Sequence, residues 1–414
     1  MISRNALKSL ASIVGVFFLF LAMNPFLLWI VWPVLINIPM FLVLISLFLV
    51  LIRFDETVIS YSRVILAFLA LLFLIHLGTP FLGNPGWEIG KISSFLGFIC
   101  LIFFSDKIIF QIFLKFRYLL KIISWFALVV FIITAVGVEL PYYKIPAFTL
   151  VMENSFKGEA FYKLYGLVVS STNTVYSFGG MNIARICGPV QEPGHFAIYL
   201  GVLVFFEKII FNKISKIFII VGILTFSPNF LIILFISFLN DLFTKKGFNN
   251  SLKYIIGAVV LFISLLISSE EVREEVMYLV VGRNFGEGIM GVSDVLDNRA
   301  GKVALSFYNR FSGTYEIWYG KGIDNLQQFG VLSDYRGMIF KFGIIGLVLS
   351  FLMVFNIVSN INNKLYKFLL SLIILIIYLQ RSWMFESTFI YAFLVIGIVC
   401  LNNRSFFNLS TYEK

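Results

Sequence analysis

The chain has 414 residues, of which 60% are hydrophobic and only 13% are charged. A soluble domain is usually about 45–50% apolar and about 25% charged, so this composition excludes an ordinary soluble protein and indicates a membrane protein. The net charge of +10 does not indicate a nucleic-acid-binding protein, because many of the positive residues lie in short clusters between apolar segments.

About twelve apolar segments reach or approach the ~20 residues that a membrane-spanning helix needs. No alternating pattern of an outer-membrane barrel is present, and the first segment has no small-residue cleavage site, so we interpret it as a retained helix. We therefore predict an all-α polytopic membrane protein that forms one domain over residues 1–414. The predicted spans are 9–30, 34–53, 60–77, 91–105, 119–138, 195–211, 217–227, 229–243, 254–268, 338–358, 366–379 and 385–401.

The connections between the apolar segments are alternately rich and poor in lysine and arginine. Short connections at 78–88 and 227–229 have almost none, whereas the intervening set is rich, as in Lys107/Lys115/Arg117/Lys121 and Lys208/Lys213/Lys216. By the positive-inside rule the rich connections and both termini are cytoplasmic. Two long segments, 139–194 and 269–337, then lie on the outer face. Long loops in a compact protein usually carry function, so we expect the functional site there.

The first outer segment ends in RICGPVQEPGHFAIYL (185–200). We expect a proline near the first position of the sixth span, where its missing N–H is harmless. A helix N-terminus favours anions, and Arg185 adds a planar fork suited to phosphate oxygens. Glu192 and His195 are candidates to accept or donate a proton beside a bound anionic group. The alternative interpretation is that Arg185 is an interfacial anchor, Glu192 is a helix-start charge and His195 is a half-buried interface residue.

The second outer segment interleaves arginines with aromatic residues. Arg299 and Arg310 lie near Tyr315 and Trp318, a combination that suits phosphate binding and sugar stacking. The alternative is an aromatic belt at the membrane surface. Arg336 begins the tenth span and could face the same outer-face site as these residues. An arginine at the end of a span is, however, more often an interfacial anchor.

Other chemistry is not indicated by the sequence. His76 ends the third span, where a polar helix end explains it. The three cysteines define no disulfide framework, and there is no phosphate-binding loop and no metal-ligand spacing. We therefore predict no metal and no cofactor.

The chain resembles the bacterial O-antigen and capsule repeat-unit polymerases, the Wzy-type proteins. The architecture matches over nearly the full length. An Arg-x-x-Gly-x-x-x-Glu-Pro-x-x-x-Ala element is present as Arg185, Gly188, Glu192, Pro193 and Ala197. In addition, the second outer segment carries a Gly-x-Gly turn in GKGIDN (320–325) and leads into a Gly-x-x-Gly span, GIIGLVLSFL (343–352).

The resemblance implies a multi-pass enzyme of the bacterial cytoplasmic (inner) membrane with its active site on the periplasmic face. Such polymerases transfer the growing glycan from undecaprenyl diphosphate to the terminal sugar of a new lipid-linked unit. On this basis Glu192 is the first candidate for the base, with His195 as the alternative. Arg185 and Arg310, with Arg299 and Arg336, would hold the diphosphate, and Tyr315 and Trp318 would bind sugar.

The partners implied are the lipid-linked oligosaccharide as donor and acceptor, membrane lipid, and a chain-length regulator and flippase, but not nucleic acid. Two alternatives remain. The related O-antigen ligases carry a His-Asn pair about eleven residues before the Gly-x-x-Gly span, where this chain has Leu332-Ser333. A flippase or other transporter usually lacks two long outer loops and places its charges within the bundle.

Overall fold

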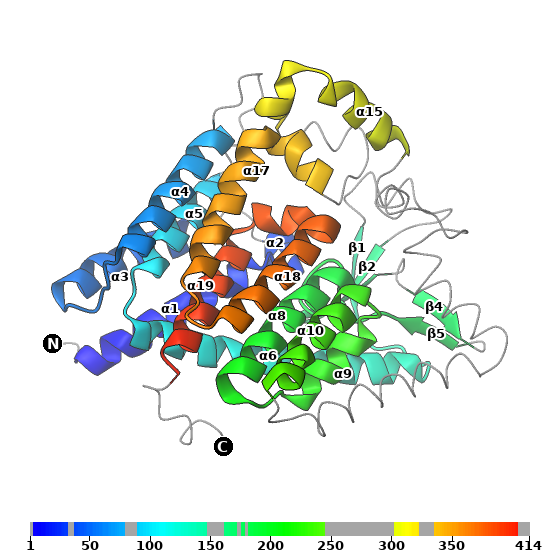
Figure 1. Cartoon of the computed structure of the whole chain (residues 1–414). Helices are drawn as coiled ribbons and strands as arrows, with labels where there is room; N and C mark the ends of the chain where they lie inside the picture. The colour runs from blue at the N-terminus through cyan, green and yellow to red at the C-terminus, as the bar shows by residue number, and fades with distance from the viewer. Residues whose placement is uncertain are drawn as a thin grey trace. The chain divides into compact units, whose positions relative to one another are not determined.

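The computed structural model describes residues 3–31, 37–78, 89–146, 161–171, 175–178, 181–244, 302–322 and 335–404. The described part is mostly helical (Figure 1). It forms two compact units. The first unit comprises Met1–Leu120, Val303–Lys367 and Tyr378–Lys414, and the second comprises Lys121–Lys302 and Phe368–Ile377.

The first unit is a helical bundle with a buried aromatic core. Within it α17 packs against α4, α3 packs against α5, and α19 contacts α1, α5 and α17. Phe116 of α6 lies 5.9 Å from Phe389 and 5.7 Å from Phe393, both on α19, measured between ring centroids. Its described elements are α1 (Arg4–Ala22), α2 (Phe26–Val31), α3 (Asn37–Arg53), α4 (Tyr61–Gly78), α5 (Ile89–Ile102), α15 (Lys302–Ser312), the 3₁₀ helix η3 (Tyr315–Trp318), α17 (Tyr335–Ser359), the 3₁₀ helix η4 (Ser382–Glu386) and α19 (Thr388–Asn402).

Helices α6 (Asp106–Ala135) and α18 (Lys364–Arg381) are divided between the two units, and the first residue of α15, Lys302, also belongs to the second unit. The second unit also contains α8 (Pro193–Phe211), α9 (Lys216–Leu224) and α10 (Pro228–Thr244). Helix α8 packs against α9 and α10, and most of its residues are buried.

Five short strands precede α8 in the second unit. A two-residue Gly166-Leu167 turn joins β2 to β3, and the positive φ of Gly166 (61°) suits the turn types that match strand twist. The strands are β1 (Tyr143–Pro146), β2 (Phe161–Tyr165), β3 (Val168–Ser171), β4 (Val175–Phe178) and β5 (Met181–Ala184). They form an antiparallel sheet in the order β1-β2-β3 and a separate β4-β5 hairpin.

Four described helices are long and apolar enough to cross a membrane: α1, α6, α8 and α17. Shorter apolar helices occur in α3, α4, α5, α10 and α19. These helices support the prediction of a membrane protein, whereas the number of spans stays a prediction. Each predicted span other than 254–268 overlaps at least one described helix, and 254–268 lies outside the described residues.

Three details of the sequence prediction need correction. The first span is broken at Pro25, because α1 ends at Ala22, Asn24 has a φ of 54° and proline cannot donate to the helical ladder. Helix α6 begins at Asp106 rather than 119, since Ile108, Phe113 and their neighbours supply a further buried face. The all-α prediction is wrong for the five described strands β1 to β5, where β-branched and aromatic residues favour strands.

Candidate functional site

Glu192 and His195 meet at the start of α8 in the second unit. Glu192 is the N-cap residue in an extended conformation (φ −124°, ψ 141°), and Pro193 occupies the first turn. The Glu192 side chain does not cap the helix. Instead, its Oε2 lies 3.2 Å from Nε2 of His195, one turn further along. At this separation a protonated imidazole forms an ion pair with the carboxylate.

The two side chains differ in exposure. The Glu192 side chain is 46% exposed and that of His195 is 13% exposed. The carboxylate can therefore meet a substrate from solvent, whereas the imidazole lies mostly within the protein. The helix start predicted near Pro193 is present, and Glu192 and His195 lie at it, whereas the Arg185 guanidinium bonds to the Thr225 and Phe226 carbonyls. The catalytic role of Glu192 and His195 stays a prediction.

Tyr162 of β2 is a candidate that the sequence analysis missed. It is buried, and its hydroxyl oxygen accepts a hydrogen bond of 2.5 Å from Nε2 of Gln191. Burial raises the pKa of the Tyr162 hydroxyl and the charge of Glu192 raises it further, against the opposing effect of the Gln191 hydrogen bond. The hydroxyl therefore stays protonated, and its hydrogen bond fixes Gln191, the residue before Glu192. Alternation in Phe161–Tyr165 could have signalled a buried face, but not this partner.

Arg185 is buried and bonds to backbone within the second unit. Its Nε donates to the Thr225 carbonyl at 2.7 Å, and an Nη donates to the Phe226 carbonyl at 3.1 Å. Both carbonyls belong to the corner between α9 and α10. The guanidinium therefore holds this corner against the segment before α8, a positioning role. The predicted role in diphosphate binding stays a prediction.

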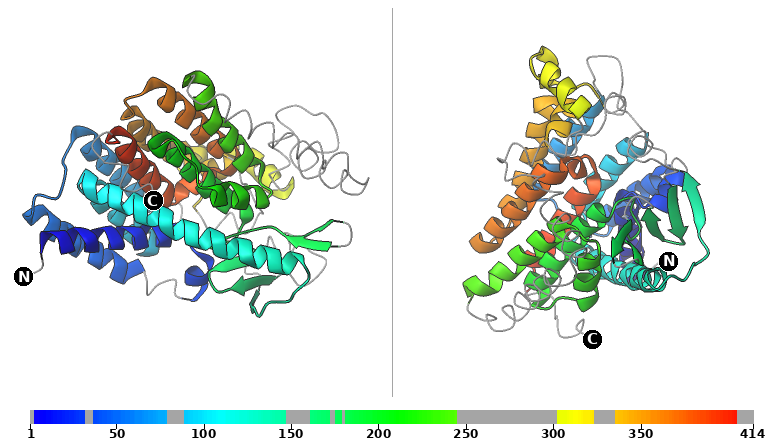
Figure 2. Two further views of the ribbon diagram at one scale, coloured as in Figure 1. Left: turned by 90° about the horizontal axis from the view of Figure 1, so that it is seen from below. Right: turned by 90° about the vertical axis from the view of Figure 1, so that its right-hand side faces the viewer.

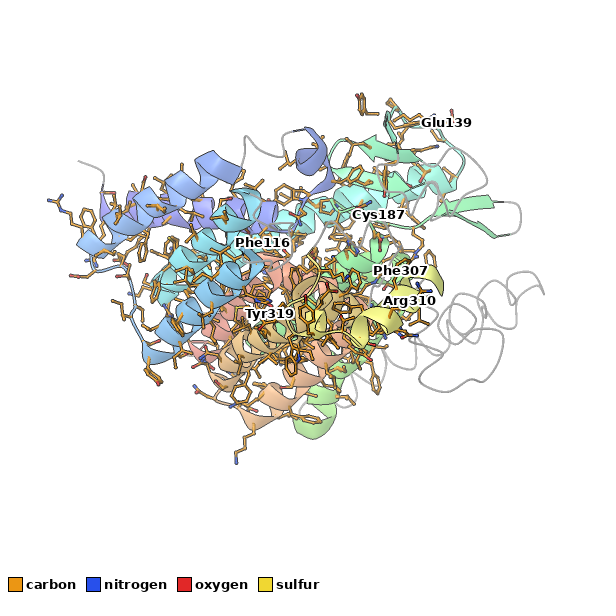
Figure 3. The ribbon with its side chains drawn as sticks, turned by 90° about the horizontal axis from the view of Figure 1, so that it is seen from above. Phe116, Glu139, Cys187, Phe307, Arg310 and Tyr319 are labelled. Atoms are coloured by element: carbon orange, nitrogen blue, oxygen red, sulfur yellow. The ribbon has the colours of Figure 1, made fainter. Side chains whose placement is uncertain are left out.

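Gly188 allows that segment to pack closely. Its φ is 59°, and a Cβ there would lie 2.5 Å from the ring of Phe196 in α8. Its carbonyl accepts a hydrogen bond of 2.8 Å from the N–H of Val169 in β3. The neighbouring Cys187 is buried where the chain passes from the strands to α8 (Figure 3). Arg185 and Gly188 thus each help to pack the segment that precedes α8.

The first unit carries a separate group of predicted residues. On α15, Phe311 packs against Phe340 of α17 with ring centroids 5.0 Å apart. Arg310 is exposed, and its guanidinium carbon lies 5.9 Å from the centroid of the Phe307 ring (Figure 3). On η3, Tyr315 is 71% exposed and Trp318 is 53% exposed. These aromatic faces are accessible to a ligand, as sugar stacking requires.

Residues 320–322 dock on a kink in α17. The helix is interrupted at Gly343 (φ 66°, ψ −177°). The N–H of Lys321 donates to the Phe340 carbonyl at 2.7 Å, and that of Gly322 donates to the Lys341 carbonyl at 3.0 Å. His76 of α4 donates from Nε2 to the Phe342 carbonyl at 2.6 Å. Three consecutive carbonyls at the kink thus receive donors from two other segments.

Ion pairs brace the same region. Lys321 Nζ lies 2.7 Å from a carboxylate oxygen of Glu316, and Lys341 Nζ lies 2.8 Å from one of Glu386. Arg336, in the first turn of α17, is buried. Arg299 lies outside the described residues.

Among the described residues, no group of three or more His, Cys, Asp or Glu side chains could hold a metal ion. No family model, no curated protein and no solved structure matches this chain.

Proposed function

We propose that the protein is a metal-independent glycosyltransferase that polymerises lipid-linked oligosaccharide units at the outer face of a bacterial cytoplasmic membrane. The observation that carries the proposal is the Glu192–His195 pair, 3.2 Å apart at the N-terminus of α8. The pair lies within the sequence element that resembles the Wzy-type polymerases. Long apolar helices and the sequence-based expectation of about twelve spans suit an enzyme whose substrates are membrane-anchored.

In the proposed reaction the acceptor sugar hydroxyl attacks the anomeric carbon of the growing glycan. The new carbon–oxygen bond forms as the bond to the diphosphate oxygen breaks, and the electron pair leaves with undecaprenyl diphosphate. Glu192 takes the acceptor proton, because its carboxylate is partly exposed and lies beside an imidazole. His195 holds the carboxylate and is the alternative base.

The leaving diphosphate develops negative charge that must be stabilised. The N-terminus of α8 places the positive end of its helix dipole beside Glu192, and helix N-termini suit anions. In the first unit, the exposed Arg310 guanidinium and the exposed rings of Tyr315 and Trp318 suit binding of phosphate and sugar. Arg185 contributes by holding the segment that leads to Glu192.

A deletion strain tests this proposal directly. We expect it to carry single repeat units on its carrier lipid at the outer face and to attach one unit to the surface acceptor, as seen on a gel of surface glycan. Accumulation of units on the cytoplasmic face would instead identify a flippase. Loss of even single-unit attachment would identify a ligase. Reintroducing the wild-type chain should restore the ladder.

A further inference from the structure

The segment 185–192, which leads into α8, is attached to two parts of the second unit. At its start, Arg185 bonds to the corner between α9 and α10. Further along, the Gly188 carbonyl accepts a hydrogen bond of 2.8 Å from the N–H of Val169 in β3. The sheet therefore holds the chain where it approaches the start of α8.

A side chain of the sheet makes a contact that is closer still to Glu192. Gln191 directly precedes Glu192, and its Nε2 donates to the hydroxyl oxygen of Tyr162 in β2 at 2.5 Å. Tyr162 is only 2% exposed, so water cannot readily replace this bond. Burial raises the pKa of the Tyr162 hydroxyl and the charge of Glu192 raises it further. The hydroxyl and the carboxylate are therefore near enough to interact.

The second unit fixes the position of Tyr162. Strand β2 is the central strand of its sheet, where Tyr162 lies opposite Ile145 of β1 and Ser171 of β3. The β2–β3 turn packs beside α6, since a Cβ at Gly166 would lie 3.7 Å from the ring of Phe126. Figure 2 shows the strands beside the C-terminal end of α6. The Tyr162 hydroxyl is therefore a fixed point near the start of α8.

We propose that Tyr162 and Gln191 are positioning residues that keep the Glu192 carboxylate beside His195 at the start of α8. This inference rests on the proposed function, in which Glu192 takes the acceptor proton. The Glu192 side chain is 46% exposed and does not cap α8, so a cap does not set its position. The bond between Tyr162 and Gln191 instead fixes the backbone that carries it. A general base must lie within about 2.6–3.2 Å of the atom whose proton it takes, so a small displacement lowers the rate strongly.

The two histidines of the chain allow a direct measurement of this geometry. Solid-state NMR of the full-length protein in lipid bilayers, labelled with ¹⁵N-histidine, gives imidazole signals from two rings, and His76→Gln assigns them. The His195 nitrogen beside Glu192 responds to the carboxylate, and Glu192→Gln gives its signal without that charge. We expect Tyr162→Phe, which removes only the hydroxyl, to move the His195 signal toward that of Glu192→Gln. Tyr165→Phe is the matched control and should leave the signal in place, because Tyr165 is a buried tyrosine on the opposite face of β2.

Chain growth in the deletion strain measures the consequence. At matched protein level, Tyr162→Phe and Gln191→Met should each lengthen the surface glycan about 10–100-fold more slowly than the wild type. The double variant should be no slower than either single variant, because both changes break the same bond. Losses that add in the double variant, or an unmoved His195 signal in both single variants, overturn the inference. Near-normal chain growth from Glu192→Gln overturns the proposed function instead, even where the His195 signal moves, so the two failures are distinguishable.

Discussion

The backbones of Gly320 and Gly343 are in direct contact in the first unit. A Cβ on Gly320 would lie 2.4 Å from the Lys341 carbonyl oxygen, and one on Gly343 would lie 2.3 Å from the Trp318 carbonyl oxygen. Both residues have positive φ, 84° and 66°. Each glycine is therefore required twice, for its conformation and for the close approach of the other segment. This contact explains the GKG turn and the first glycine of GIIG.

Replacing either glycine by alanine should destabilise the protein. A left-handed conformation costs an L-residue about 1–2 kcal/mol, and the contact with backbone adds to this. We expect Gly320→Ala and Gly343→Ala to lower the midpoint of thermal unfolding in detergent, measured by intrinsic fluorescence. Gly313→Ala is the matched control, because its Cβ would lie at an ordinary 3.7 Å from the Arg310 carbonyl. Equal midpoints for all three variants would contradict the contact.

Removing the imidazole of His76 should expose the kink in α17. His76→Ala leaves the Phe342 carbonyl without this donor, and an unsatisfied buried polar group costs about 1–3 kcal/mol. The unfolding midpoint should fall for His76→Ala and recover in part for His76→Gln, whose amide can donate. If alanine and glutamine are equally destabilising, volume rather than the hydrogen bond explains the role of His76.

Glu56 should contribute to the pH dependence of stability. Burial would raise its pKa, but hydrogen bonds and charges from Lys8 and Arg4 outweigh burial and lower the pKa below 4.5. A depressed pKa stabilises the fold above the unfolded value, and the contribution is lost as the pH falls through the folded pKa. Glu56→Gln should lower the unfolding midpoint at neutral pH and flatten its decline below about pH 4.5.

The matched control for this variant is Asp55→Asn, because Asp55 is an exposed neighbour. It should leave the unfolding midpoint at neutral pH unchanged. If the unfolding midpoint of Glu56→Gln falls with pH in parallel with that of the wild type, other carboxylates account for the loss of stability at low pH.

A lysine at position 185 should not fulfil the structural role of Arg185. One ammonium cannot reproduce the two bonds that the planar fork makes to the Thr225 and Phe226 carbonyls, and hydrogen bonds to charged groups contribute about 1.5–3 kcal/mol. Arg185→Lys should lower both the unfolding midpoint and polymer yield. Arg310→Lys, at an exposed arginine, should leave the midpoint unchanged. A normal midpoint with lost donor binding in Arg185→Lys would favour direct contact with diphosphate.

Glu192→Gln should stop chain growth while the protein stays folded. A general base contributes about 10²–10⁴-fold to a rate, and the amide cannot accept the proton. Polymer length on a gel of surface glycan and protein level in the membrane are measured together. Glu139→Gln removes an exposed carboxylate from the same outer segment and should leave the ladder intact. Near-normal polymer from Glu192→Gln would leave Glu192 with a structural role.

Local patterns in the sequence predicted the helices and the start of α8, because apolar length and proline position act over neighbouring residues. The 3.2 Å approach of His195 to Glu192 follows from their spacing of three along a helix. The partners of Arg185 lie 40 and 41 residues away, and Tyr162 lies 29 residues from Gln191. No periodicity encodes such pairs, so the positioning role of Arg185 and the place of Tyr162 required the fold.

The strands were missed for a different reason. In the three-stranded sheet, Tyr162, Leu164 and Val169 are buried among short segments that are too brief to give a clear period. Only the Gly166 turn is a strong local signal, and it is flanked by apolar residues on both sides. A loop prediction was therefore the natural result of reading length and polarity alone.

The kink in α17 has a consequence for biosynthesis. His76, Lys321 and Gly322 all precede Phe340, Lys341 and Phe342 in the chain, so every one of these donors leaves the ribosome before the carbonyl that it binds. A broken helix would enter the bilayer with unsatisfied carbonyls, each costing several kcal/mol in hydrocarbon. Here the emerging helix meets partners that are already made. A circular permutation that placed α4 after α17 would reverse this order for His76.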